Sequence, residues 1–471
     1  MNINTKNLNQ IAEANDLNII PKEVLSEKVI QFGTGVLLRG LPDYYINQAN
    51  LSGDFQGSVV VVKSTDQGDL KSFEEQDYIY TLLTEGIENG NIVQHKEIIT
   101  CISRILTTKN HWNQLLKTIE NPNIEFIISN TTESGIIEID HESIDSPSSF
   151  PGRVTALLYH RFIHFQGTEE SGLIILPTEL IDNNADELKR IVLYIATKNK
   201  LPEAFINWIN KANHFCNTLV DRIVPGKTDD TSWNYKDELA VAVEPYNLWA
   251  IEVKDMRIMD RIGFAKANKG IKLTDSIHNI KELKLRLLNA SHTLLCPLAI
   301  LAHHEYVKNS LELEIFEKWI KELMKTEITQ HLLNNKIESN EIVEFSSFII
   351  DRFKNPFINH KWISIAQNST NKWKQRVVPI LLTWNALNKD SSRHIALSMA
   401  AYLKCNELFE LEYFPIDDRI KQSIETKQTI HDILNREDIW GYKLGDNISF
   451  SQLVTDFYNE INTKSILQII N

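Results

Sequence analysis

The sequence contains few cysteines, and they are far apart. Its 471 residues include only Cys101, Cys216, Cys296 and Cys405, and none of them forms a C-x-x-C pair. This spacing argues against a zinc knuckle and against a disulfide framework, whereas it suits a reducing compartment.

A basic excess and a long apolar run are also missing. Sixty-two acidic residues outnumber 49 basic ones, which gives a formal charge of −13, and no block of Lys and Arg occurs. Nucleic acids and anionic membranes are therefore poor candidates for partners. The first ten residues are polar, and the longest apolar run, residues 293–302, is about half as long as a membrane span. We expect a cytoplasmic protein with neither membrane nor nucleic-acid partners.

The first half of the chain alternates between two kinds of pattern. Short apolar runs, typical of buried parallel strands, occur at Val29–Phe32, Val59–Val62, Ile124–Ile128 and Leu173–Leu176. Amphipathic patterns between them predict helices at residues 37–49, 111–120 and 153–165. This alternation favours an α/β fold with a Rossmann-type doubly wound sheet.

Beyond residue 280 the pattern becomes mainly helical. Helices are predicted at residues 280–301, 311–324, 341–352 and 393–403, and strand-like runs are rare. The length suggests two or three domains. We predict a dinucleotide-binding domain over residues 1–275 and a mostly α-helical substrate and catalytic domain over residues 276–471.

A glycine turn follows the first predicted strand. Gly33 and Gly35 have the spacing that opens a dinucleotide-binding turn, in which the first glycine allows the tight turn and the second lets a pyrophosphate approach the backbone. The usual third glycine is replaced by Leu38, and Arg39 follows as a candidate partner for phosphate. A G-x-G pattern alone is weak, but the strand–turn–helix order favours cofactor binding.

Other candidate cofactor residues follow two later strands. Asp66 comes after the second strand and could bind the adenosine ribose, whereas Lys63 could equally accept a 2′-phosphate. The residues therefore leave NAD and NADP open. Asn130 and Thr131 follow the strand that ends near Ser129, and we assign them to the cofactor site as well.

The segment from Lys284 to His292 carries three polar side chains that could perform ketone reduction. At about 100° per residue, Asn289 lies roughly 140° and His292 roughly 80° from Lys284, so all three fit one broad helix face. Lys284 can act as general acid and base if burial makes its ammonium easier to deprotonate. Asn289 can stabilise a developing oxyanion, and His292 can hold a substrate hydroxyl or orient the lysine. Spacing alone leaves open that they are a solvated lysine and ordinary buried polar groups.

Four ordered motifs make the chain resemble the mannitol dehydrogenase family, the polyol-specific long-chain dehydrogenases. They cover about residues 28–380 and comprise Gln31–Arg39 (G-x-G-x-x-x-R), Asn217–Ile223 (N-x-x-V-D-R-I), Lys284-x4-Asn289-x2-His292, and Arg352–Pro356 followed by Ser369–Lys372. The resemblance implies NAD(H) as cofactor, no metal, a Rossmann-type N-terminal domain and a helical C-terminal domain. It also implies Lys284 as general acid and base, Asn289 in the oxyanion hole, and His292, Asp221 and Lys372 around the substrate.

Within that family the chain resembles most the branch that acts on hexuronates. Residues 129–135, 177–182 and 215–221 carry this resemblance. It implies reversible NAD-dependent reduction of D-tagaturonate to D-altronate in hexuronate breakdown, with a small-molecule sugar acid as substrate. The alternatives are fructuronate reductase, mannitol 2-dehydrogenase and, outside enzymes, a catalytically silent NAD-binding sensor.

Several positions bear on the substrate. We assign Asn184 to the substrate site, within a turn where the family's Asn-Gly is replaced by Asn184-Ala185. Arg286, inside the catalytic motif, is more typical of the mannitol and mannonate branches. Candidates for pairing with a uronate carboxylate are Arg222, Lys372, Lys374 and Arg376. Any of them could instead form a surface or interdomain ion pair, and for Lys374 and Arg376 we favour that interpretation.

Overall fold

The computed structural model describes residues 1–21, 25–65, 70–131, 135–228, 233–387, 392–408 and 414–470. The chain divides into two compact units. Unit 1 comprises Met1–Glu85 and Val93–Ile277, and unit 2 comprises Gly86–Ile92 and His278–Asn471.

A six-stranded parallel sheet organises unit 1. Its strands are β1 (Ser26–Phe32), β2 (Gly57–Lys63), β5 (Ile102–Thr107), β6 (Phe126–Ser129), β7 (Ile174–Pro177) and β8 (His214–Phe215), in the order β5-β2-β1-β6-β7-β8. The chain leaves β1 toward β2 on one side and reaches β6 on the other, so the strand order reverses between β1 and β6. In such sheets a ligand binds at the carboxyl ends of the two strands that flank the reversal. The predicted doubly wound sheet is confirmed.

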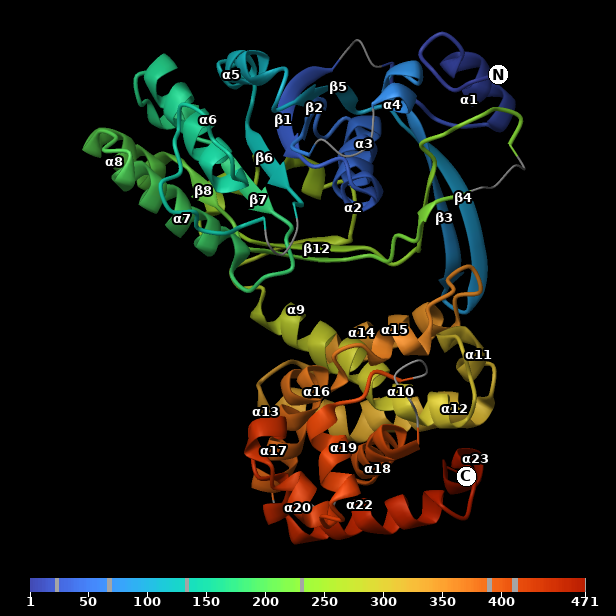
Figure 1. Ribbon diagram of the computed structural model, residues 1–471. Helices are drawn as coiled ribbons and strands as arrows, with labels where there is room; N and C mark the ends of the chain where they lie inside the picture. Colours follow the sequence, from blue (N-terminus) through green and yellow to red (C-terminus); the bar gives the residue numbers. More distant parts are fainter. Residues whose placement is uncertain are drawn as a thin grey trace. The chain divides into compact units, whose positions relative to one another are not determined.

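Alternate side chains of the strands supply two separate apolar cores. Val29, Val59 and Val61 face one core, whereas Ile30, Val60 and Val62 face the other, because successive side chains of a strand point to opposite faces. Helix α3 (Pro42–Ser52) covers the first face. Helices α5 (Trp112–Ile119), α6 (Phe150–His164), α7 (Asn184–Lys198) and α8 (Glu203–Ala212) cover the second (Figure 1).

The helix predicted over residues 37–49 is two helices. α2 (Val36–Gly40) ends at Leu41, whose φ of −135° is not helical, and α3 begins at Pro42. Proline disfavours the helical conformation at the residue before it, yet it suits the first turn of a new helix. The break places the short helix α2 directly after the glycine turn.

Two smaller sheets of unit 1 were not predicted. β3 (Tyr80–Glu88) and β4 (Asn91–Ile99) form a hairpin and join β10 (Gly226–Lys227) and β11 (Val241–Val243) in the order β10-β11-β3-β4. β9 (Thr218–Asp221), β12 (Leu248–Glu252) and β13 (Ile271–Thr274) form a mixed sheet in the order β13-β12-β9. Unit 1 also contains α1 (Leu8–Asn15) and α4 (Lys71–Glu75).

The described residues of unit 2 form helices joined by turns and loops, apart from the tip of the β3–β4 hairpin and an isolated bridge between Tyr306 and Lys361. Its α-helices are α9 (His278–Leu283), α10 (Ser291–Leu301), α11 (Val307–Leu311), α12 (Glu314–Leu323), α13 (Thr329–Asn334), α14 (Ser339–Lys354), α15 (Trp362–Ala366), α16 (Ser369–Lys372), α17 (Val378–Ala386), α18 (Arg393–Leu408), α19 (Asp418–Glu425), α20 (Ile430–Leu434), α21 (Glu437–Trp440), α22 (Ile448–Ile461) and α23 (Ile466–Ile470). The mostly helical C-terminal part is as predicted.

The helix predicted over residues 280–301 is interrupted. Between α9 and α10, the segment Lys284–Ala290 is a π-helix, and two further π-helical segments follow at Met324–Ile328 and Trp373–Val377. The first of them packs against both others. Such segments are rare, and they occur frequently at functional sites. Among the described residues, no helix combines the length and the apolar character needed to cross a membrane.

Candidate active site

The turn after β1 requires glycine at its first position. Gly33 has a φ of +125°, and its N–H donates to the carbonyl of Val62 over 3.0 Å. A Cβ at this position would lie 2.8 Å from Cδ1 of Leu38 and 2.9 Å from the carbonyl oxygen of Asn130. Gly33 therefore joins the carboxyl ends of β1 and β6, where the strand order reverses.

The second glycine of the turn faces open space. Gly35 precedes α2 with an ordinary φ of −64°, and no atom of the part of the chain that the structure describes lies within 4 Å of a Cβ built on it. Glycine is therefore not needed here for folding, and its bare backbone leaves room for a ligand. Leu38, at the place of the third glycine, is fully buried and packs against Gly33. The turn thus fits the pyrophosphate of a dinucleotide.

Arg39 is directed toward protein groups. Its guanidinium lies over the rings of Phe73 and Tyr80, and Nη1 donates to the carbonyl of Leu239 over 2.6 Å. Burial lowers its pKa, against the opposing charges of Tyr80 and Asp43. A contact with phosphate stays a prediction for this side chain, and it would require Arg39 to bind a second group.

The loop after β6 is held by residues that follow β7. The amide of Asn130 donates to the hydroxyl of Thr178 over 3.0 Å, and the backbone N–H and the hydroxyl of Thr131 donate to the buried carboxylate of Glu179. Asn130 and Thr131 thus lie in a fixed loop at the reversal point, and their contact with the cofactor stays a prediction. Asp66, the predicted ribose ligand, lies outside the described residues.

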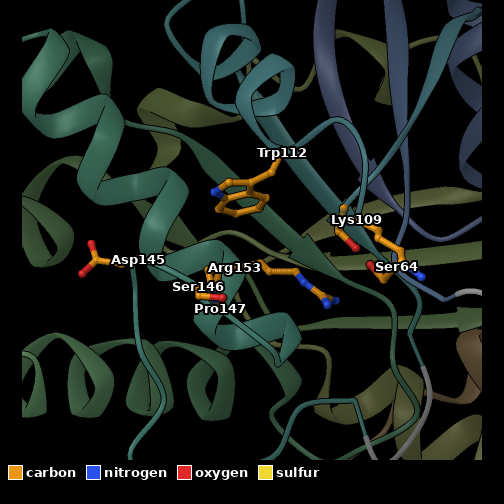
Figure 2. Close-up of a pocket in the computed structure, with 8 residues that line it drawn as sticks. Ser64, Lys109, Trp112, Asp145, Ser146, Pro147 and Arg153 are labelled. Atoms are coloured by element: carbon orange, nitrogen blue, oxygen red, sulfur yellow. The ribbon is translucent and has the colours of Figure 1, made fainter.

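A pocket of about 430 Å³ opens at the carboxyl ends of β2 and β5. Its lining comprises Ser64, Thr108, Lys109, Trp112, Asp145, Ser146, Pro147 and Arg153. Figure 2 shows the side chain of Arg153 extending toward Ser64 and Lys109, with the indole of Trp112 nearby and Asp145 away from them. The hydroxyl oxygen of Ser64 is buried and has no hydrogen-bond partner among the described residues. The pocket therefore offers a flat apolar wall, two cations and an unused hydroxyl.

Sequence reasoning missed most of this pocket. Thr108 and Lys109 follow β5, a strand that the pattern did not reveal, and Trp112 begins the next helix. Lys63, which was considered as a partner for a 2′-phosphate, is buried, and its ammonium donates to the carbonyl of Thr65 over 2.5 Å. The cations that line the pocket are instead Lys109 and Arg153.

Two predicted substrate residues of unit 1 are engaged by the protein itself. The amide nitrogen of Asn184 donates to the carbonyls of Pro177, Glu179 and Thr218, and its oxygen accepts from the N–H of Thr218. The left-handed φ of the turn falls on Asn183, which tolerates it, so Ala185 is not strained. Substrate binding by Asn184 stays a prediction, and these contacts weigh against it.

Arg222 is similarly enclosed, whereas Asp221 ends β9. The guanidinium of Arg222 donates to the carbonyls of Gly40 and Glu244 over 2.7 and 3.0 Å and stacks on Tyr44. Burial lowers its pKa. Asp221 is buried and pairs with Leu248 of β12. Both assignments stay predictions, although the contacts of Arg222 give it a structural role.

In unit 2 the π-helix changes the geometry of the central motif. A π-helix is closed by hydrogen bonds between residues five apart, rather than four. Lys284 and Asn289 are five apart and begin and nearly end this segment, so they lie almost above one another. The 140° separation calculated for an α-helix is therefore too large. Both side chains are partly exposed, as groups that meet a substrate must be.

His292, on the next helical turn, lies in an aromatic cluster. Its ring is stacked 4.0 Å from that of Phe353, and the ring of His360 is 5.6 Å away. Burial and the charge of Lys372 lower the pKa of His360, which favours a neutral imidazole. Phe353 and His360 are members of this cluster that sequence reasoning missed.

Lys372 connects this cluster to the third π-helical segment. Its ammonium donates to the carbonyl of Ile365 over 2.8 Å, and burial together with the neighbouring Arg376 lowers its pKa. Arg376 donates to the carbonyl of Asn289 over 3.3 Å. These contacts bring Asn289, His292 and Lys372 into one cluster of unit 2, whereas Lys374 is exposed.

The chain matches two family models in succession. Residues 27–261 match the mannitol dehydrogenase Rossmann domain, and residues 276–462 match the mannitol dehydrogenase C-terminal domain. Among solved structures, mannitol 2-dehydrogenase of Pseudomonas fluorescens, in a complex with NAD and D-mannitol, is 20% identical with a TM-score of 0.71 over 100% of this chain and 99% of that one. A D-sorbitol dehydrogenase is 19% identical with a TM-score of 0.82 over both complete chains. These two likenesses concern the fold.

Similar sequences extend over nearly the whole chain. Altronate oxidoreductase of Bacillus subtilis is 34% identical over 93% of both chains. The protein of that name from Halalkalibacterium halodurans is 30% identical over 95% of this chain and 93% of its own. The one from Yersinia enterocolitica is 32% identical over 91% and 88%. With both family models matched in order, the chain belongs to the mannitol dehydrogenase family of oxidoreductases.

Proposed function

We propose that this chain is an NAD-dependent reductase that interconverts D-tagaturonate and D-altronate. The reaction type rests above all on the π-helical segment, which carries Lys284 and Asn289 five residues apart, and on the cluster in which Asn289, His292 and Lys372 lie. The substrate rests on the relatives named altronate oxidoreductase, which match more than nine-tenths of the chain.

The residues of unit 1 fit a dinucleotide. The open face of Gly35 accommodates the pyrophosphate, and the loop of Asn130 and Thr131 flanks the same reversal point. Pockets of about 300–1,000 Å³ commonly hold small ligands, and this one sets the indole of Trp112 among mainly polar residues. We place the adenosine half in the pocket of Trp112 and Arg153. The bound nicotinamide supplies or accepts the hydride.

The residues of unit 2 then handle the proton and the charge. Lys284 donates a proton from its ammonium to the oxygen of the ketone as that oxygen becomes a hydroxyl, and it takes the proton back in the oxidative direction. The amide of Asn289 donates a hydrogen bond to the same oxygen and stabilises its developing negative charge. His292 holds a neighbouring substrate hydroxyl.

A uronate also carries a carboxylate, which needs a cation. Lys372 is the best placed, because it lies partly buried beside His360 and Arg376 and has already lost part of its hydration. A carboxylate beside it would offset the burial and the charge of Arg376, which together lower its pKa. Arg222, by contrast, has its guanidinium satisfied within unit 1.

The test is the loss of NADH absorbance with tagaturonate, fructuronate and fructose offered in parallel, each repeated with NADPH. We expect tagaturonate to have the highest kcat/KM. Fructose should be slower by about a hundredfold or more, because it has no carboxylate to pair with the partly buried ammonium of Lys372.

The contrary outcomes separate the alternatives. A higher kcat/KM with fructuronate would identify the chain as a fructuronate reductase, and a higher kcat/KM with fructose would identify it as a mannitol 2-dehydrogenase. Tight NADH binding without turnover of any ketone would favour the sensor. Activity with NADPH alone would overturn the cofactor assignment and direct attention to Lys109 and Arg153.

A further inference from the structure

Arg286 lies within the π-helical segment that carries Lys284 and Asn289, and its side chain is buried. Its guanidinium Nη1 donates to the backbone carbonyls of Gln375 and Arg376 over 2.7 and 2.9 Å. Those carbonyls belong to the segment Trp373–Val377, which directly follows Lys372. One side chain of the first segment therefore holds the backbone of the other.

The sequence explains why the carbonyl of Gln375 accepts a hydrogen bond from a side chain of another segment. Pro379 follows Gln375 by four residues and has no N–H, so the Gln375 carbonyl has no partner at α-helical spacing. A carbonyl that is shielded from water and lacks a donor costs about 1–3 kcal/mol, and this one lies in a partly buried contact. The guanidinium of Arg286 fills this place.

A second arginine, on the segment Trp373–Val377, donates hydrogen bonds back to the first segment and to the helix that follows it. Arg376 donates through Nη1 to the carbonyl of Asn289 and to the hydroxyl of Thr293, over 3.3 and 3.2 Å. Burial lowers the pKa of Arg376 to about 10, so it remains a cation at neutral pH. The two segments are thus joined by reciprocal arginine contacts, one of which ends on the backbone of Asn289.

The guanidinium of Arg286 is itself held by an acidic side chain. Glu282 accepts from its Nε over 3.0 Å and lies 3.6 Å from Nε2 of His331, whose Nδ1 is 2.8 Å from the hydroxyl of Thr383 on α17. Although burial opposes it, hydrogen bonds from His331 and Arg286 lower the pKa of Glu282 to about 2. The carboxylate therefore stays charged over the whole physiological range.

We propose that Arg286 is a positioning residue, which sets Lys284 and Asn289 relative to Lys372 by clamping the two π-helical segments together. Arg286 points into the contact between these segments and donates to their backbone, so it acts through other residues and not on the substrate. The expected effect on catalysis rests on the proposed function. The expected effect on the contact between the two segments does not.

The test compares Arg286→Ala with Arg190→Ala, a control at an exposed arginine on α7 that pairs with Glu138 and Glu187. Hydrogen–deuterium exchange is measured over peptides that cover residues 284–301 and 373–387, and kinetics are measured with NADH and tagaturonate. We expect faster exchange in both peptides of Arg286→Ala and in neither of the control. We also expect kcat to fall about 100-fold with a smaller change in KM, because a displacement of about 1 Å has that effect on positioned groups.

Chemical rescue distinguishes positioning from general stability. Methylguanidinium should restore kcat of Arg286→Ala by about tenfold, whereas methylammonium should not, because only a planar guanidinium can bind Glu282 through Nε and Nη2 while its Nη1 donates to the two carbonyls. Arg286→Lys should remain impaired for the same reason. NADH binding, followed by fluorescence, should match that of the wild type in all variants.

Each contrary result overturns the proposal. Unchanged exchange in both peptides would show that no clamp exists. If methylguanidinium raised the melting temperature and left kcat per folded molecule unaffected, Arg286 would be merely structural. If the wild type reduced no keto acid, the proposed function would fail, and the exchange measurement would still decide whether Arg286 joins the two segments.

Discussion

The two glycines of the nucleotide turn should fail in different ways when each is replaced by alanine. Gly33 has a φ of +125°, and a new Cβ would lie 2.8 and 2.9 Å from Leu38 and the Asn130 carbonyl. The backbone conformation costs about 1–3 kcal/mol and the overpacking a similar amount. We therefore expect Gly33→Ala to destabilise unit 1 by about 2–5 kcal/mol and to lower its melting temperature by about 5–15 °C.

Gly35→Ala is the matched partner. Its φ of −64° is normal, and nothing lies within 4 Å of the new Cβ. The free energy of unfolding should therefore change by less than about 1 kcal/mol, with stabilisation the more natural sign because the unfolded chain loses freedom. The methyl group would, however, occupy the space assigned to the pyrophosphate. NADH affinity should fall tenfold or more, which is about 1.4 kcal/mol.

The assay is thermal unfolding together with a titration of NADH fluorescence for both variants. A stable Gly35→Ala that binds NADH as tightly as the wild type would refute the placement of the cofactor. An unaffected melting temperature in Gly33→Ala would refute the steric argument for the turn.

Three further predictions concern charge. Asp43 is fully buried, and burial raises its pKa to about 7, so the folded protein binds one more proton than the unfolded chain between about pH 4 and 7. The free energy of unfolding should therefore fall by up to about 4 kcal/mol as the pH rises through that window, and Asp43→Asn should flatten this decline in urea unfolding. Arg161 donates to four backbone carbonyls in the interior, so Arg161→Met should lower the free energy of unfolding by about 3–5 kcal/mol. The exposed Arg190→Ala should lower it by less than about 1 kcal/mol, and equal losses in the two variants would contradict this expectation. Lys372→Met should raise KM for tagaturonate by tenfold or more and spare fructose, and a parallel loss for both would deny the carboxylate contact.

The parallel sheet could be predicted because buried strands have a simple signature. Val59–Val62 is a continuous β-branched run, and the glycine turn after Phe32 marks the reversal point. The hairpin of β3 and β4 could not be found in the same way. Its outer strand is largely exposed and carries residues such as Gln94 and His95, so the apolar alternation that reveals a strand is weak there.

The geometry of the catalytic motif was beyond sequence reasoning for a different reason. An angle per residue assumes one helix type, and nothing in the letters from Lys284 to Asn289 announces a π-helix. Arg286 illustrates the consequence, because it looked like a marker of substrate branch, whereas the structure places it between two backbone segments. The signal that could have helped is Pro379, which deprives a carbonyl of its donor.

Asn184 and Arg222 show a second limit of prediction from sequence, which concerns the partners of polar side chains. Arg222 lies within a family motif and Asn184 lies just after one, which made them candidates for the substrate. A sequence cannot say whether such a side chain points to a ligand or closes the protein's own hydrogen bonds, and both are engaged with backbone carbonyls here. Only the pattern of partners distinguishes the two cases.

The central claim is that this chain moves a hydride to a keto sugar acid with Lys284 as proton donor. Its most direct test is mass spectrometry of the product formed from tagaturonate and NADH deuterated at both hydrogens of the nicotinamide C4, with Lys284→Ala and the exposed Lys318→Ala compared. The account predicts altronate with one deuterium on the carbon of the new hydroxyl, a rate about 10²–10⁴-fold lower in Lys284→Ala, and no change in Lys318→Ala. Unlabelled product, or a normal rate in Lys284→Ala, would contradict it.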